Sequence, residues 1–136
     1  MENLKHSVLI VDDQRIAVME ISNALRPDCT IYAAGNGPDA LAAAEEHQPD
    51  VILLDIKMEN MDGFEIITVL KKSEKTKEIP VIFVTGRTDA ESEEKAFALG
   101  AADYIRKSFS PSVLKLRVLH QIKLSEMNET ITAPAE

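Results

Sequence analysis

The sequence is short of several residue types, and each shortage excludes a class of protein. It has one cysteine among 136 residues, Cys29, so no disulfide can form within the chain and the thiol is expected to be a small buried group. Its 15 basic residues are outnumbered by 23 acidic ones, which gives a net charge of −8. Direct binding to nucleic acid is therefore disfavoured, because phosphate backbones are bound by clustered Lys and Arg.

Long hydrophobic runs are also missing. Clean apolar runs such as Val8–Val11 and Val51–Leu54 are short, whereas a membrane-spanning helix needs about 20 apolar residues. Charged residues interrupt the first segment, MENLKHSVLIVDD, so it lacks the apolar core of a signal peptide. We therefore expect a cytoplasmic protein that does not bind a membrane.

What the sequence does contain fits one globular domain. Hydrophobic residues make up 45% of the chain and charged residues 28%, which is enough to bury a core. We expect the domain to occupy residues 1–127. The last segment, 128–136, is polar and without periodicity (NETITAPAE), and we expect it to be a tail or the start of a linker.

Short β-branched runs alternate with helical patterns along the chain. The expected strands are Val8–Val11, Thr30–Ala33, Val51–Leu54, Val81–Val84 and Asp103–Ile105. The expected helices begin near Gln14, Pro38, Gly63, Thr88 and Ser110. The fourth opens with the capping-box pattern Thr88-Asp89-Ala90-Glu91, and the fifth is expected to end near Met127. Strand–helix repeats with continuously apolar strands predict an α/β fold, a parallel sheet with helices on both faces.

Carboxylates follow two of the expected strands. Asp12 and Asp13 follow the first strand, and Asp55 follows the third. Taken alone, Asp12-Asp13 also fits the start of a helix, since Asp is a good N-cap. If the two strands are neighbours, the three carboxylates meet at the edge where parallel sheets bind ligands. With Lys107 as the nearby cation the cluster keeps a charge of about −2, which predicts a divalent ion with oxygen ligands, Mg²⁺ or Mn²⁺.

The same edge carries groups suited to phosphoryl transfer. Asp55, at the end of the middle strand, is the expected nucleophile, since a carboxylate can form an aspartyl phosphate. Thr85 follows the fourth strand and would donate a hydrogen bond to a phosphoryl oxygen. Lys107 follows the fifth strand and would neutralise charge on the transferred group.

Together these residues resemble the receiver domains of bacterial two-component response regulators, the CheY-like superfamily, over residues 7–122. The resemblance rests on Asp12-Asp13, Asp55 within DIKMENMDG, Thr85-Gly86 after VIFV, and Lys107 within DYIRKSF. It implies a flavodoxin-like (βα)5 three-layer sandwich with the parallel strands in the order 2-1-3-4-5. It also implies that a sensor histidine kinase or a phosphotransfer protein phosphorylates Asp55, and that the domain catalyses only its own phosphoryl transfer and autodephosphorylation.

The resemblance assigns roles to three further positions. The backbone carbonyl of Lys57, two residues past Asp55, would join the metal ligands. Tyr104 would turn inward on activation and repack the face formed by the fourth helix, the fifth strand and the fifth helix. Lys57 and Arg87 stand at the two positions that tune how fast the acyl phosphate hydrolyses.

Two positions depart from the family pattern. Glu59 and Ser108 stand where the family often has proline. A cis peptide bond before a residue other than proline costs about 2.5–4 kcal/mol, so the Lys107–Ser108 bond can be trans. The departure bears on the placement of Lys107 rather than on its role.

The last expected helix has two apolar sides. One side would pack on the sheet and carries Leu114, Val118, Leu119 and Ile122. The roughly opposite side carries Val113, Leu116, Leu124 and Met127. An exposed apolar patch often marks an interface, so we expect a homodimer or a fused output domain to cover it. The opening of this helix, SFSPSVLKLRV, resembles receivers that precede cyclic-dinucleotide enzymes or belong to hybrid kinases.

Two other classes of protein remain as alternatives. A haloacid dehalogenase-like phosphatase also uses an Asp at a strand end, but it needs a second Asp two residues later, where this chain has Lys57. A flavodoxin-like cofactor-binding module needs a hydroxyl-rich phosphate loop after its first strand. Here that loop begins DDQR, which would repel a phosphate.

Overall fold

The structure is a computed structural model that describes residues 6–132. The last residues of the expected tail, 133–136, lie outside the described part. Strands and helices alternate along the chain: β1 (His6–Val11), α1 (Arg15–Leu25), β2 (Cys29–Ala34), α2 (Gly37–His47), β3 (Val51–Leu54), α3 (Gly63–Lys72), β4 (Val81–Thr85), α4 (Ala90–Ala98), β5 (Asp103–Arg106) and α5 (Pro111–Thr132). All the strands and helices expected from the sequence are present.

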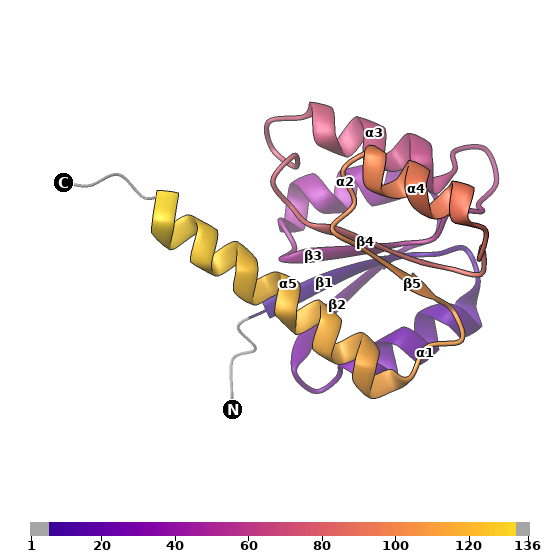
Figure 1. The fold of residues 1–136 in the computed structure, drawn as a ribbon, viewed down its shortest axis with the longest axis horizontal. Coiled ribbons are helices and arrows are strands. Elements are labelled where there is room, and N and C mark those ends of the chain that lie inside the picture. Colours follow the sequence, from indigo (N-terminus) through magenta and orange to yellow (C-terminus); the bar gives the residue numbers. More distant parts are fainter. Residues whose placement is uncertain (1–5, 133–136) are drawn as a thin grey trace.

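The strands form one parallel sheet in the order β2-β1-β3-β4-β5, which confirms the predicted topology. Helices α1 and α5 cover one face of the sheet and α2, α3 and α4 cover the other, so the molecule has three layers (Figure 1). The central strands lie between two helical layers, and for this reason their apolar residues run without a break. None of the helices in residues 6–132 combines the length and hydrophobicity that crossing a bilayer requires.

Each strand supplies both hydrophobic cores, because successive side chains point to opposite faces. In β1, Val8 and Ile10 pack with α1 and α5, whereas Leu9 and Val11 pack with the α2, α3 and α4 layer. Cys29 is buried in the first of these cores, as expected. The core therefore fixes the strand ends, and the loops that follow them hold the candidate site.

Two helix starts are set by aspartate side chains. Asp62 accepts a hydrogen bond from the backbone of Glu65, whose side chain accepts one from the backbone of Asp62 in return, so a complete capping box opens α3. The predicted capping box at Thr88 is wrong. The N-cap of α4 is Asp89, which accepts from the backbone of Ser92 at 2.9 Å. The acidic side chain one residue later takes the cap, because Asp is a better N-cap than Thr.

Helix α5 is longer than predicted. It begins at Pro111, as expected, but continues to Thr132 rather than ending near Met127. Its second half extends beyond the sheet and away from the body of the molecule (Figure 1). Leu114, Val118 and Ile122 are buried against the sheet and Leu119 packs at the edge of this core, which confirms the predicted inner side.

Candidate functional site

The topology brings four strand ends to one edge of the sheet. Val11 of β1 is in register with Leu54 of β3, so Asp12 and Asp55 follow neighbouring strands at the same level. On the other side of β3, Thr85 ends β4 and is in register with Arg106, which places Lys107 at this edge as well. The edge predicted from the sequence is therefore assembled as expected, and its inner side chains are buried.

The three carboxylates predicted to meet do meet. Asp12, Asp13 and Asp55 each offer an oxygen, and these oxygens lie within 4.8 Å of one another. Asp12 and Asp55 are almost fully buried, whereas Asp13 is exposed. Buried carboxylates so close together repel one another unless cations compensate their charge.

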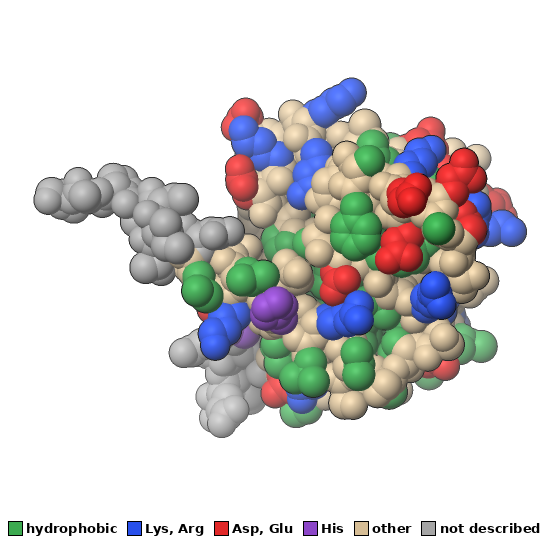
Figure 2. All heavy atoms as spheres, in the orientation of Figure 1, with side chains coloured by type: hydrophobic (Ala, Val, Ile, Leu, Met, Phe, Trp, Pro, Cys, Tyr) green, Lys and Arg blue, Asp and Glu red, His purple; other side chains and the backbone are tan. Residues whose placement is uncertain are grey.

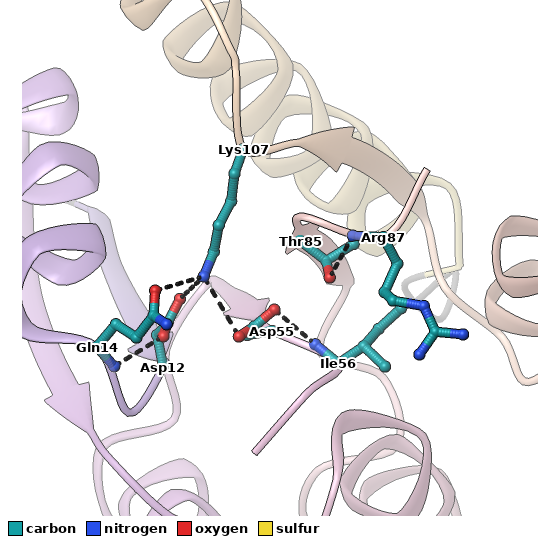
Figure 3. A network of polar contacts seen from close by, with 7 residues as sticks. All are labelled: Asp12, Gln14, Asp55, Ile56, Thr85, Arg87 and Lys107. Atoms are coloured by element: carbon teal, nitrogen blue, oxygen red, sulfur yellow. Dashed lines mark hydrogen bonds and ion pairs between the residues drawn. The ribbon is translucent and has the colours of Figure 1, made fainter. Parts of the chain in front are cut away.

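Lys107 supplies part of that compensation. Its Nζ lies 2.9 Å from Asp12 Oδ2 and 3.3 Å from Asp55 Oδ2. Gln14 also takes part, because its side-chain oxygen lies 3.5 Å from the same Nζ and its backbone N–H donates to Asp12 Oδ1 at 2.9 Å. Figure 3 shows Lys107 reaching between the two aspartates, while the backbone N–H of Ile56 donates to the other oxygen of Asp55 at 2.9 Å.

The protonation of the pocket follows from burial and charge. Burial and the neighbouring Asp12 carboxylate raise the pKa of Asp55, against the opposing effects of Lys107 and of the Thr85 hydroxyl. The pKa of Lys107 is raised too, because its contacts with the Asp12 and Asp55 carboxylates outweigh the effect of its burial. Lys107 thus stays charged, but one cation leaves the acidic cluster undercompensated.

The donor set fits a hard divalent cation. The buried Oδ2 of Asp12 forms an ion pair with Lys107 at 2.9 Å but has no hydrogen-bond partner of good geometry within residues 6–132, so it can still serve as a metal ligand. The carbonyl oxygen of Lys57 likewise accepts no hydrogen bond within this part of the chain. Carboxylate and carbonyl oxygens are the ligands that Mg²⁺ and Mn²⁺ prefer.

Thr85 and Tyr104 lie on the opposite side of Asp55 from Asp12. The Thr85 hydroxyl is buried and accepts from the backbone N–H of Arg87 at 3.3 Å. Tyr104 is also buried, and its hydroxyl donates to the backbone carbonyl of Arg87 at 2.8 Å. Burial raises the pKa of this phenol. The Tyr104 side chain therefore points inward in this structure.

The side chains of Lys57 and Arg87 are both exposed, and neither forms a hydrogen bond or ion pair with Asp55. The Arg87 guanidinium points away from the pocket (Figure 3), and its Nε lies 3.3 Å from Asp89 Oδ1. The Lys107–Ser108 peptide bond is trans, since the cis bond in residues 6–132 is Arg26–Pro27. A trans bond still allows Lys107 to reach both aspartates.

Two residues of this site were not predicted. Gln14 follows the acidic pair directly, and its proximity in the sequence was a signal that it could share their environment. Asp89 was considered only as part of a helix start, and nothing in the sequence linked its carboxylate to Arg87. That contact depends on side-chain torsions in the loop after β4.

Comparison with known proteins agrees with this geometry. A family model described as the response regulator receiver domain matches residues 8–119. The chain belongs to this family. It is a receiver domain of two-component systems, and the phosphatase and flavodoxin-like alternatives find no support.

The curated relatives are longer proteins. The receiver domain is 41% identical over 119 residues to a probable cyclic di-GMP phosphodiesterase of Vibrio cholerae, covering 87% of this chain and 27% of that protein. It is 33% identical to the transcriptional regulatory protein YvrH of Bacillus subtilis, covering 97% of this chain and 57% of that one. This chain thus spans about a quarter of the first relative's length and about half of the second's.

Solved structures of receivers match almost from end to end. A response regulator from Chloroflexus aurantiacus superposes with a TM-score of 0.82 at 28% identity, covering 87% of this chain and 98% of that one. The receiver domain of DrrB, activated by BeF3, gives a TM-score of 0.78 at 29% identity, covering 87% and 97%. CheY4 of Vibrio cholerae gives 0.78 at 30% identity, covering 86% and 98%. Receiver domains are in general phosphoacceptors rather than enzymes acting on other molecules.

Proposed function

We propose that Asp55 is the phosphoacceptor, phosphorylated by a sensor histidine kinase or a phosphotransfer protein. The observation that supports this most directly is the pairing of a buried Asp55 carboxylate with Lys107 Nζ at 3.3 Å, beside two further carboxylates. A carboxylate kept from water but not fully neutralised is a competent nucleophile towards a phosphoryl donor. Asp12, Asp13 and Asp55, with the carbonyl of Lys57, would hold Mg²⁺.

In the transfer step an oxygen of Asp55 forms a bond to phosphorus as the bond between phosphorus and the donor imidazole nitrogen breaks. The electron pair of the broken bond stays with the imidazole. Lys107 is already within hydrogen-bond distance of Asp55 and would remain on the phosphoryl oxygens, with the Thr85 hydroxyl turning from Arg87 to donate to another. Bound Mg²⁺ would supply further neutralisation of the phosphoryl charge.

The signal would leave the pocket through Tyr104 and the α4–β5–α5 face. Thr85 and Tyr104 both bond to Arg87, at its N–H and its carbonyl. A phosphoryl group that draws Thr85 away removes one of these two bonds and so changes the loop that holds Tyr104. Lys57 and Arg87 would set how long the phosphoryl group persists, a role that is excluded if Lys57→Ala and Arg87→Ala both leave the dephosphorylation rate unchanged.

The outer side of α5 is proposed as the surface for a second copy or a fused output domain. Val113, Leu116, Leu124 and Met127 are exposed along it. In Figure 2 hydrophobic side chains gather over α5 on this face of the molecule. Relatives of this chain carry more than the receiver, as the lengths of the curated proteins show, so a following domain is consistent with this surface.

Incubation with acetyl phosphate and Mg²⁺ tests the phosphoacceptor. Intact-mass analysis is expected to show a gain of one phosphoryl group in the wild type and in Asp39→Asn, a matched change of an exposed aspartate. Asp55→Asn is expected to show no gain, and chelation of Mg²⁺ should prevent it in every variant. A phosphoryl group that persists in Asp55→Asn would refute the assignment.

A further inference from the structure

Arg87 is held by Asp89 on the outside of the β4–α4 loop. The Nε of Arg87 donates to Asp89 Oδ1 at 3.3 Å, while the other oxygen, Oδ2, accepts from the backbone of Ser92 at 2.9 Å. Hydrogen bonds from the side chain and backbone of Ser92 lower the pKa of Asp89 to about 2. Asp89 is therefore ionised at any physiological pH, and Arg87 always carries its charge.

The backbone of Arg87, in contrast, lies at the pocket. Its N–H donates to Thr85 Oγ1, and the Thr85 hydroxyl is close enough to Asp55 to affect its pKa. A rotation about the side-chain bonds of Arg87 would bring its guanidinium from Asp89 towards Asp55. Because the backbone of Arg87 already lies beside the pocket, the contacts of its side chain decide where the guanidinium lies.

We propose that Asp89 is a positioning residue that holds the Arg87 guanidinium away from the phosphoacceptor pocket, so that Arg87 contacts the phosphoryl group only when this ion pair opens. The inference rests on the proposed phosphorylation of Asp55. It adds to the site an anion that competes for Arg87 and that lies outside the acidic cluster, at the N-cap of α4.

The ion pair between Arg87 and Asp89 is weak enough for a phosphoryl group on Asp55 to compete with Asp89 for the guanidinium. Both side chains of the pair are about half exposed, at 50% for Arg87 and 45% for Asp89, and exposed ion pairs are weak. A phosphorylated aspartate carries more negative charge than Asp89 and offers oxygens that match a guanidinium. Removing the charge of Asp89 should therefore shift Arg87 towards the pocket.

The experiment measures the affinity of the full chain for beryllium trifluoride, a phosphoryl mimic, in the presence of Mg²⁺ by calorimetry. Asp89→Asn keeps a good N-cap but removes the charge, and is expected to bind the mimic about two- to fivefold more tightly, the range that an exposed ion pair accounts for. Asp89→Glu keeps the charge but is a poorer cap, and is expected to bind as the wild type does. If Asp89 acted only as a helix cap, Asp89→Glu would change the affinity for the mimic and Asp89→Asn would leave it unchanged.

The double variant identifies Arg87 as the residue that responds. Arg87→Ala is expected to bind no more tightly than the wild type, and Asp89→Asn is expected to have no effect in the Arg87→Ala background. Asp62→Asn, which neutralises the N-cap of α3 instead, controls for the loss of one negative charge and should leave the affinity unchanged. Thermal unfolding confirms that each variant is folded.

The outcomes separate this inference from the phosphoacceptor assignment. If the wild type accepts a phosphoryl group on Asp55 but Asp89→Asn binds the mimic unchanged, or still binds more tightly without Arg87, the positioning role of Asp89 is wrong and the phosphoacceptor stands. If neither phosphorylation nor the mimic depends on Asp55, both are wrong.

Discussion

At the residue scale, Gly63 is a position beside the pocket where even one added carbon atom would clash with the backbone. Helix α3 begins at Gly63 directly against the loop after β3, and the Gly63 N–H donates to the carbonyl of Ile56 at 2.8 Å. A Cβ at this position would overlap the carbonyl oxygen of Asp55 and lie 2.9 Å from the Cα of Ile56. Both are backbone atoms, so the loop that carries Asp55 would have to move.

Gly63→Ala is therefore expected to lower the free energy of unfolding by about 1–3 kcal/mol, the usual effect of overpacking. Gly86→Ala is the matched control, because a Cβ there meets nothing within 4 Å, and its effect should stay below about 1 kcal/mol. Urea unfolding of the two variants measures the difference. Equal stability of both variants would show that the loop after β3 yields easily.

Asp55 itself should make the folded state less stable when it is ionised. Burial and Asp12 raise its pKa above the usual value, so the folded state favours the protonated acid, and stability is lost as the pH rises through the folded-state pKa. Asp55→Asn removes this penalty, and Lys107 keeps its ion pair with Asp12 at 2.9 Å.

We expect Asp55→Asn to be more stable than the wild type at pH 7 without Mg²⁺, with the difference shrinking as the pH is lowered towards the ordinary pKa of Asp. Urea unfolding across this pH range measures it, and Asp39→Asn, at an exposed site, should show no such gain. A variant less stable than the wild type at pH 7 would mean that the contacts of Asp55 outweigh its burial.

At the scale of elements, one side of α5 is buried against the sheet and the other side is exposed. Leu114 is fully buried against the sheet, whereas Leu116, two residues later, is 66% exposed. Leu114 therefore contributes to the hydrophobic core, whereas Leu116 is available to contact a partner. The exposed side stays available because no other helix of residues 6–132 covers it.

Leu114→Ala is expected to cost about 2–5 kcal/mol of unfolding free energy, the range for large-to-small changes in a core. Leu116→Ala should change it by less than about 0.5 kcal/mol. If the outer side of α5 binds a second copy, however, Leu116→Ala should weaken self-association in sedimentation experiments while Leu114→Ala affects mainly stability. A large loss of monomer stability in Leu116→Ala would contradict this division.

At the scale of the whole molecule, the acidic pocket links elements far apart in the sequence. It takes side chains from the ends of β1, β3, β4 and β5, so a ligand that binds it stabilises the folded chain as a unit. The unfolded chain holds no such arrangement of carboxylates. Metal binding should therefore raise the thermal unfolding temperature of the chain.

Mg²⁺ at about 100 times its dissociation constant is expected to stabilise the wild type by about 2.7 kcal/mol. Asp13→Asn should lose most of this gain but keep its stability without the metal, because Asp13 is exposed. Differential scanning calorimetry with and without EDTA measures both. An unchanged response to Mg²⁺ in Asp13→Asn would place the metal elsewhere.

The sequence by itself determined the strands, the helices and the kind of chemistry at the sheet edge. Apolar runs such as Val51–Leu54 and the acids that follow them are local patterns, and parallel strands bring their carboxyl ends to one edge whatever the details of packing. For this reason the positions of Asp12, Asp55, Thr85 and Lys107 could be predicted.

Only the tertiary structure decided how these side chains are paired. Lys107 lies closer to Asp12, at 2.9 Å, than to Asp55, at 3.3 Å, and Arg87 pairs with Asp89 outside the pocket. Such contacts depend on side-chain torsions and on distances between segments remote in the sequence. No periodicity encodes them, because they arise only once the strands have packed in their final order.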